Sequence, residues 1–238
     1  MNDRATNDVA VLVPAAGLGT RLGPGVPKAL REVGGASLLA HAVRRIGRAR
    51  GVGCVVVAAP VGQSEGVASN LQGLLSAAVS LRVVDGGATR QESVAAALAA
   101  VPPDYSIVLV HDAARSFAPP ELIERVARAV RDGADAVIPV LPVIDTIKQV
   151  DADGYVTATP DRSGLRAVQT PQGFRRAVLE QAHRLGPALG EVTDDAAMVE
   201  RLGVRVFCVP GSEAALKITR PADLATAEQL CDPESLAG

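Results

Sequence analysis

Short apolar runs alternate along this chain with segments whose apolar residues recur at helical spacing. The runs, rich in β-branched residues as strands are, lie at 9–13, 54–58, 81–84, 107–110, 134–140 and 204–209. The helical segments lie at 37–49, 62–77, 90–101, 119–131, 174–185 and 194–201, with a last short helix from Pro221. Strands alternating with helices form βαβ units, and continuous apolar strands need cover on both faces. We therefore expect an α/β fold with a mostly parallel, Rossmann-like three-layer sheet.

The composition supports a large core and excludes several classes of protein. The 238 residues, of which 48% are hydrophobic, suit a single domain over 1–238. With aromatic residues at only 2%, the core must consist of Val, Leu, Ile and Ala. A net charge of −2 argues against nucleic acid as a partner. No apolar stretch approaches the roughly 20 residues of a membrane span, so we expect no membrane association.

The three cysteines are scattered and have no metal-ligand or disulfide pattern. A reducing compartment fits this usage, so we expect a cytoplasmic protein. Cys54 and Cys208 lie in apolar runs, which predicts that both pack in the core.

One stretch interrupts the alternation of strands and helices. Residues 142–164 are polar, and the turn signal Asp151-Ala152-Asp153-Gly154 separates two candidate strands at 146–150 and 155–159. This pattern predicts a protruding β-hairpin arm. An exposed hairpin leaves open edges unless something covers it, and the natural cover is a second copy of the chain. We expect a homodimer formed through this arm, the alternative being an ordinary surface excursion.

The loop after the first apolar run has the character of a phosphate-binding loop. A strand that feeds a loop of small residues leaves backbone N–H groups free to bind an anion. The small residues here are Ala15, Ala16, Gly17 and Gly19, and the cations Arg21 and Lys28 follow them. It is not a Walker loop, because Ala29 follows the lysine, and not a dinucleotide fingerprint, because Leu22 stands where the third glycine belongs. A plain tight turn is the alternative, but the added cations favour nucleotide phosphates.

Two later segments follow strands and carry polar groups. Gly86 and Gly87 allow close backbone approach to a flat ligand, and Ser93 lies at the start of the next helix, where a simple helix cap is the alternative. Asp112 follows the fourth run at the edge where α/β sheets place ligand groups, and its oxygens suit Mg²⁺ shared with phosphates. Arg115 can bind anions, whereas we assign the neighbouring His111 a packing role.

Further segments are weak signals when taken singly. The pair Asp194-Asp195 at a helix start is typical of capping. Lys217 ahead of Pro221 could be simple strand-edge chemistry.

Taken in order, these segments resemble one family, the 2-C-methyl-D-erythritol 4-phosphate cytidylyltransferases of the non-mevalonate isoprenoid pathway. The resemblance extends from residue 11 to about 230. It rests on the segments 14–28, 86–93, 112–115, 145–148, 170–172, 193–194 and 217–221.

The resemblance implies a function and a role for each matching residue. It implies transfer of CMP from CTP to methylerythritol 4-phosphate, with Mg²⁺ or another divalent cation. Arg21, Lys28, Arg162 and Lys217 would be catalytic. Residues around CTP would be Ala15, Ala16, Gly17, Gly19, Gly87, Ala88, Ser93, Asp112 and Ala113. Residues for the acceptor would be Asp112, Arg115, Thr146, Arg162, Thr170, Thr193 and Lys217, of which Thr146 and Arg162 would reach the neighbouring subunit's site. Asp112 would also contact the metal.

The chain departs from the family's pattern at Ala88, where members often carry an acidic residue, and at Ser116, where proline is common. Three alternatives remain open. A ribitol 5-phosphate cytidylyltransferase shares most of these motifs. A sugar-1-phosphate nucleotidyltransferase matches the later segments less well. A catalytically silent nucleotide-binding regulator would not need Arg21, Lys28 and Asp112 together.

Overall fold

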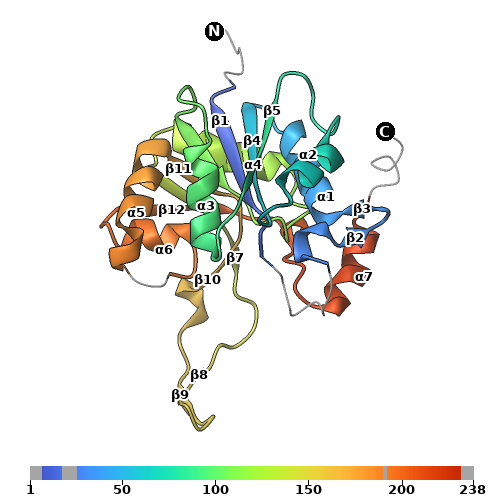
Figure 1. Ribbon diagram of the computed structural model, residues 1–238. Helices are drawn as coiled ribbons and strands as arrows, with labels where there is room; N and C mark the ends of the chain where they lie inside the picture. Colours follow the sequence, from blue (N-terminus) through green and yellow to red (C-terminus); the bar gives the residue numbers. More distant parts are fainter. Residues whose placement is uncertain (1–6, 18–25, 190–191, 232–238) are drawn as a thin grey trace.

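An eight-stranded sheet forms the centre of the computed structural model, which describes residues 7–17, 26–189 and 192–231. Its strands are β1 (Val9–Pro14), β4 (Val52–Ala59), β5 (Ser80–Asp85), β6 (Ile107–Val110), β7 (Ala136–Pro142), β10 (Arg166–Val168), β11 (Gln172–Arg175) and β12 (Val206–Pro210). Their order is β10-β7-β11-β6-β1-β4-β5, and β12 pairs with β7 (Figure 1). Strands β6, β1, β4 and β5 run parallel, whereas β11 is antiparallel to both β6 and β7. The expected mostly parallel sheet is confirmed.

Two layers of helices cover the sheet. The helices are α1 (Leu38–Arg48), α2 (Ser64–Leu71), α3 (Arg90–Ala99), α4 (Pro120–Arg131), α5 (Arg176–Leu189), α6 (Asp195–Glu200) and α7 (Pro221–Gln229), together with short 3-10 turns at Lys28–Leu30, Arg162–Gly164 and Glu213–Ala215. Alternation along β1 separates the layers. Val9, Val11 and Val13 face α1, α2 and α4, whereas Ala10 and Leu12 face α3, α5 and α6. Among the described residues, no helix has the length and apolar content needed to cross a bilayer.

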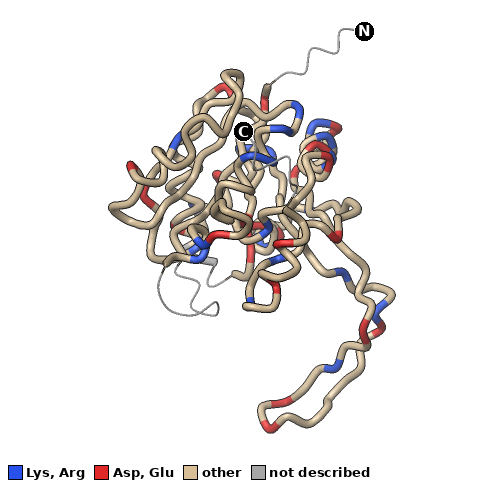
Figure 2. The backbone as a smooth tube through the Cα atoms, turned by 90° about the vertical axis from the view of Figure 1, so that its right-hand side faces the viewer, with Lys and Arg blue, Asp and Glu red and all other residues tan. Residues whose placement is uncertain are grey.

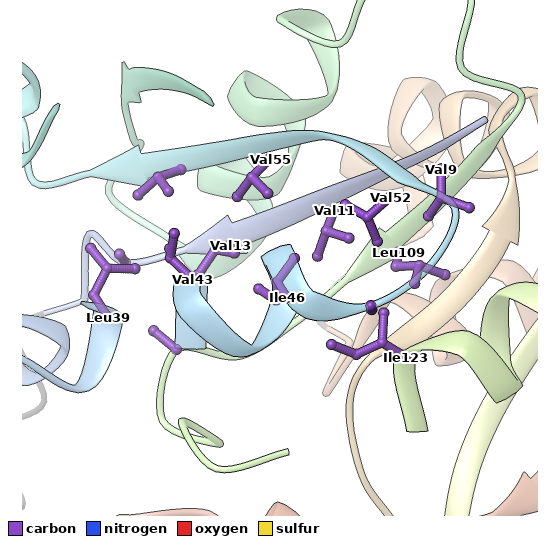
Figure 3. Packing of buried hydrophobic residues seen from close by; sticks show 14 of the residues in the cluster. Val9, Val11, Val13, Leu39, Val43, Ile46, Val52, Val55, Leu109 and Ile123 are labelled. Atoms are coloured by element: carbon purple, nitrogen blue, oxygen red, sulfur yellow. The ribbon is translucent and has the colours of Figure 1, made fainter. Parts of the chain in front are cut away.

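The first of these packing layers is dry and aliphatic. Figure 3 shows Val11 and Val13 of β1 beside Val43 and Ile46 of α1, and these four side chains have no exposed surface. Each aliphatic side chain buried in this way stabilises the fold by about 1.5 to 3 kcal/mol. Local signals place the helices. Ser37 caps α1 by accepting a hydrogen bond from the Ala40 N–H at 3.1 Å, and serine is among the residues preferred at this position.

The structure corrects three sequence expectations. Phe174, expected in a helix, lies in β11, because the strand enters between β6 and β7 and buries the ring fully. Cys208, expected in the core, is exposed, because β12 is an edge strand that pairs only with β7 and leaves Phe207 exposed as well. Helix α2 ends at Leu71 rather than at residue 77.

The arm extends from the end of β7 away from the body of the molecule, as Figures 1 and 2 both show. It ends in a hairpin of β8 (Gln149–Val150) and β9 (Val156–Ala158), shorter than expected. The Asp151 carboxylate accepts hydrogen bonds from the N–H groups of Asp153 and Tyr155, which explains the turn. A small hairpin of β2 (Glu32–Val33) and β3 (Ala36–Ser37) precedes α1.

Two glycine-to-alanine substitutions should change stability in opposite directions. A Cβ on Gly173 in β11 would lie 2.6 Å from Val126 Cγ1, so we expect G173A to lower the free energy of unfolding by about 2 kcal/mol. A Cβ on Gly66 in α2 meets no atom within 4 Å, so we expect G66A to raise it by about 0.5 kcal/mol. Urea unfolding of both variants measures the difference, and a neutral G173A would contradict the packing of α4 on β11.

Candidate functional site: a pocket at the carboxyl ends of the parallel strands

A pocket of about 280 Å³ opens where β1, β5 and β6 end. Because these strands are parallel, the loops after them meet at one edge of the sheet, although they are far apart in the sequence. The predicted site residues that line the pocket are Ala15, Ala16, Gly17, Lys28, Gly87, Ala88, Ser93, Asp112, Ala113 and Lys217. Gly19 and Arg21 lie outside the described residues, so their placement stays a prediction.

The loops after β1 and β5 touch each other. A Cβ on Gly86 would lie 2.6 Å from Ala16 Cβ and 2.9 Å from Ser93 Oγ, so only glycine fits there. The Gly87 N–H donates to Ser93 Oγ at 3.1 Å, and the Ser93 hydroxyl donates to the Thr89 carbonyl at 2.9 Å. Ser93 therefore shapes the wall of the pocket.

A capping box fixes the same loop from its other side. Glu92 accepts hydrogen bonds from the N–H groups of Ala88, at 2.7 Å, and Thr89, while Thr89 Oγ1 accepts from the Glu92 N–H. The backbone N–H of Ala88 is thus held by Glu92, and this contact needs no side chain at position 88.

The carboxylate of Asp112 is held between two cations. Arg90 Nε donates to Asp112 Oδ1 at 3.2 Å, and Lys217 Nζ lies 2.8 Å from Oδ2. Burial acts to raise the pKa of Asp112, but the charges of Arg90 and Lys217 outweigh it and hold that pKa well below its usual range. Asp112 is therefore an anion that orients two cations at the rim of the pocket.

Thr170 and His111 hold the backbone of Asp112 in place. Its N–H donates to Thr170 Oγ1 at 3.0 Å, and this hydroxyl lies 3.2 Å from His111 Nδ1. Since His111 Nε2 faces the Arg115 carbonyl, that nitrogen carries the proton, and Nδ1 accepts from Thr170. Burial lowers the pKa of His111 to about 4, so the ring is neutral at pH 7. His111 is buried and hydrogen-bonded within the protein, as a packing role requires.

Arg115 braces two segments near the pocket. Its guanidinium donates to the carbonyls of Ala215, at 2.7 Å, and Val168, at 3.1 Å. Ala215 precedes Lys217 by two residues, and Val168 ends β10 at the base of the arm. Arg115 thus supports the segment that carries Lys217.

Five of the predicted residues that the structure describes are not part of the pocket lining. Arg115 and Thr170 support it through the contacts described above, Thr193 is exposed ahead of α6, and Thr146 and Arg162 lie on the arm. The Arg162 guanidinium donates to the Ile144 carbonyl within the arm. A role for Thr146 or Arg162 in a neighbouring subunit's site stays a prediction.

Comparison with known proteins places the chain in one family. A sequence profile described as 2-C-methyl-D-erythritol 4-phosphate cytidylyltransferase matches residues 9–232. The chain belongs to this family. A curated cytidylyltransferase of that name from Frankia casuarinae is 55% identical over 232 residues, covering 96% of this chain and 84% of the relative. One from Streptomyces coelicolor is 53% identical over 232 residues, covering 94% and 85%.

Solved structures of the family share the fold. The cytidylyltransferase from Thermus thermophilus is 39% identical with a TM-score of 0.76, covering 94% of this chain and 98% of that one. The 4-diphosphocytidyl-2C-methyl-D-erythritol synthase from Anaerococcus prevotii is 28% identical with a TM-score of 0.80, covering 93% and 96%.

The pocket lining is compatible with a metal ion that is bound mainly by the substrate phosphates. Within the ranges that the structure describes, no three His, Cys, Asp or Glu side chains are grouped to hold a metal ion. Mg²⁺ shared with substrate phosphates needs only one or two protein carboxylates. Asp112 would supply one, because each of its oxygens keeps a lone pair beyond its contact with Arg90 or Lys217.

Sequence reasoning missed Arg90 as a lining residue of the pocket and Asp195 as its buried partner. Arg90, expected only at the start of a helix, lines the pocket, and its Nη1 donates to Asp195 Oδ2 at 2.7 Å. Asp194 caps α6 as expected, by accepting from the Ala197 N–H. Asp195, the second of the pair, is instead fully buried. One sequence signal could have indicated Arg90 as a site residue, namely its position three residues after the glycine pair Gly86-Gly87.

Two threonines expected to serve the same substrate should differ in their effect on stability. T170V leaves the buried Asp112 N–H and His111 Nδ1 without partners, so we expect it to lower the free energy of unfolding by about 1 to 3 kcal/mol. T193V, at an exposed position, should change it by less than about 0.5 kcal/mol. Urea unfolding provides the measurement, and equal effects would rule out the role of Thr170 behind Asp112.

Proposed function

We propose that this protein transfers CMP from CTP to 2-C-methyl-D-erythritol 4-phosphate, giving 4-diphosphocytidyl-2-C-methyl-D-erythritol and pyrophosphate, in the cytoplasm. Family membership over residues 9–232 supports the reaction. The single observation in the structure that carries the proposal is the pocket itself, where glycine-rich loops face Lys28, Lys217 and the anchored Asp112. Small residues and cations at the carboxyl ends of parallel strands suit the polyphosphate of a nucleotide.

The reaction needs little besides positioning and charge. An oxygen of the acceptor phosphate attacks the α-phosphorus of CTP and forms a P–O bond, while the bond to the oxygen bridging to the β-phosphate breaks and pyrophosphate leaves. The attacking monoester is already largely ionised at neutral pH, so no general base is required. The enzyme must bring two anions together and offset their repulsion.

Lys28 and Lys217 line the pocket and supply positive charge from two sides. We assign Lys28, with Arg21, to the CTP phosphates and the charge that develops at the α-phosphorus. We assign Lys217 to the incoming phosphate, at a position fixed by Asp112. A bound Mg²⁺ would neutralise further phosphate charge, and Asp112 would contact it.

The walls after β1 and β5 would surround the cytosine. Ala15, Ala16, Gly17, Gly87, Ala88 and Ser93 lie there. The hydrogen bonds of Ser93 and Glu92 set the backbone positions of Gly87 and Ala88. Gly19 would complete the phosphate loop.

The arm would complete the acceptor site in a homodimer. Arg115, Thr170 and Thr193 would serve the acceptor in one subunit, and Thr146 and Arg162 would come from the other. The arm carries apolar side chains that a partner could cover, with Ile144 at 76% and Tyr155 at 74% exposed. Exposed apolar residues of this kind support a subunit interface rather than a hairpin that remains exposed to solvent.

Replacing Lys28 should slow the chemical step. We expect K28A to lower kcat by at least about 10²-fold, because one preorganised charge on the reacting phosphates is lost. The matched control is R50A, which removes an exposed cation bound to Glu124 outside the pocket lining and should keep kcat unchanged. Steady-state pyrophosphate release measures both variants, and wild-type turnover by K28A would remove Lys28 from the catalytic role.

The acceptor is tested by pyrophosphate release from CTP and Mg²⁺. We expect release with methylerythritol 4-phosphate and none with ribitol 5-phosphate. Pyrophosphate release with ribitol 5-phosphate alone would identify the protein as a ribitol 5-phosphate cytidylyltransferase. The proposed mechanism of CMP transfer would be unchanged. Binding of CTP without pyrophosphate release with either acceptor would favour a catalytically silent nucleotide-binding regulator.

A further inference from the structure

A row of charged and polar groups leads from the pocket into the protein. It begins at Lys217 and Asp112 at the rim, continues through Arg90 at the start of α3, and ends at Asp195 of α6 and His183 of α5. These three helices pack on the same face of the sheet, as Figure 1 shows, so the row crosses a helix layer. Three of its members, Arg90, Asp112 and Lys217, line the pocket, whereas Asp195 and His183 do not.

Asp195 is a buried carboxylate with both oxygens engaged. Its side chain is 1% exposed, and it accepts from Arg90 Nη1 at 2.7 Å and from His183 Nε2 at 3.1 Å. Burial acts to raise the pKa of Asp195, but the hydrogen bond from His183 and the charge of Arg90 leave it below its usual value. A carboxylate anion in such a place is costly unless its partners are fixed.

The partners of Arg90 fix its orientation. Nε faces Asp112 and Nη1 faces Asp195, so two carboxylates hold two different nitrogens of one planar group. A single contact through Nε would leave the long side chain free to rotate about it. The second contact, supplied from the interior, determines where the guanidinium meets Asp112.

We propose that Asp195, oriented by His183, is a positioning residue that acts on the reaction through Arg90. It holds Arg90 against Asp112, and Asp112 in turn holds Lys217 at the rim of the pocket. This inference rests on the proposed function for its catalytic consequence. Its structural consequence, the position of Lys217, is independent of the substrate. A residue that only fills the core between α3, α5 and α6 would stabilise the fold without affecting Lys217.

The variant D195N tests the inference, because asparagine keeps the size of the side chain and removes its charge. We expect kcat to fall by about 10- to 100-fold, as it does when an outer partner of a reacting group is removed, with little change in KM for CTP. The matched control is D194N, which neutralises the neighbouring carboxylate. Asparagine caps helices as well as aspartate does, so the contact of Asp194 with the Ala197 N–H is kept, whereas the hydrogen bond from Gln172 is lost. Neither contact involves Arg90. D194N should keep the wild-type kcat.

The dependence on Arg90 separates positioning from packing. In an R90A background, D195N should cause no further fall in kcat, because the group through which it acts is already absent. The free energy of unfolding, measured for each variant, reports any packing effect separately. An equal fall of kcat in both backgrounds would overturn the inference.

A second readout needs no substrate. The chain has only three lysines, Lys28, Lys148 and Lys217, so ¹³C-lysine labelling gives few side-chain NMR signals, and the one lost in K217R belongs to Lys217. D195N should shift the Lys217 signal and leave that of Lys148, on the arm, unchanged. If D195N does not fold, H183L removes the support of Asp195 and should shift the Lys217 signal in the same direction, with a smaller fall in kcat.

The outcomes distinguish this inference from the proposed function. A wild-type protein without pyrophosphate release would overturn the function, and the Lys217 signal would still decide the role of Asp195. An active wild type, with wild-type kcat and an unshifted Lys217 signal in D195N, would overturn the positioning role alone.

Discussion

The parallel pairing of β1 with β4 and β6 is the constraint on which the other features of this molecule depend. Residues 9–13 have no exposed surface, and alternate side chains enter opposite helix layers. Since both faces must be covered, the chain returns through a helix before each new parallel strand. The carboxyl ends of these strands therefore meet at one edge, and the pocket lies there.

Charged groups brought to that edge are partly removed from water, and each is held by a partner. Asp112 and Asp195 offset the charges of Arg90 and Lys217, so this cluster has no net charge. Lys28, in the 3-10 turn after β1, is a further cation in the pocket lining. The ion pairs of the cluster fix geometry and hold Lys217 where the incoming phosphate would meet it. Cations gathered locally in this way allow a chain with a net charge of −2 to present a site suited to a nucleotide.

The sequence predicts what local chemistry determines. Ser37 caps α1 because its partner is three residues away, and β1 is recognisable because its apolar run is continuous. The features that the sequence does not predict depend on partners that are distant along the chain. Phe174 has the pattern of a helix start, but the space between β6 and β7 makes it part of a strand. Arg90 and Asp195 are 105 residues apart, and no local pattern indicates that they meet. Resemblance to a family identified the pocket residues without revealing this support behind them.

Arg115 shows how the same site is connected to the arm. One guanidinium donates to the carbonyls of Val168, at the base of the arm, and Ala215, ahead of Lys217. The Arg115 side chain is partly buried, and this burial lowers its pKa. A hydrogen bond lost in such an environment is costly. A shift of β10 relative to the segment at 215–217 would break one of these bonds. The position of Lys217 therefore depends on two supports, Asp112 from within the pocket and Arg115 from the arm's base, and the arm cannot change its attachment to the sheet without straining the second.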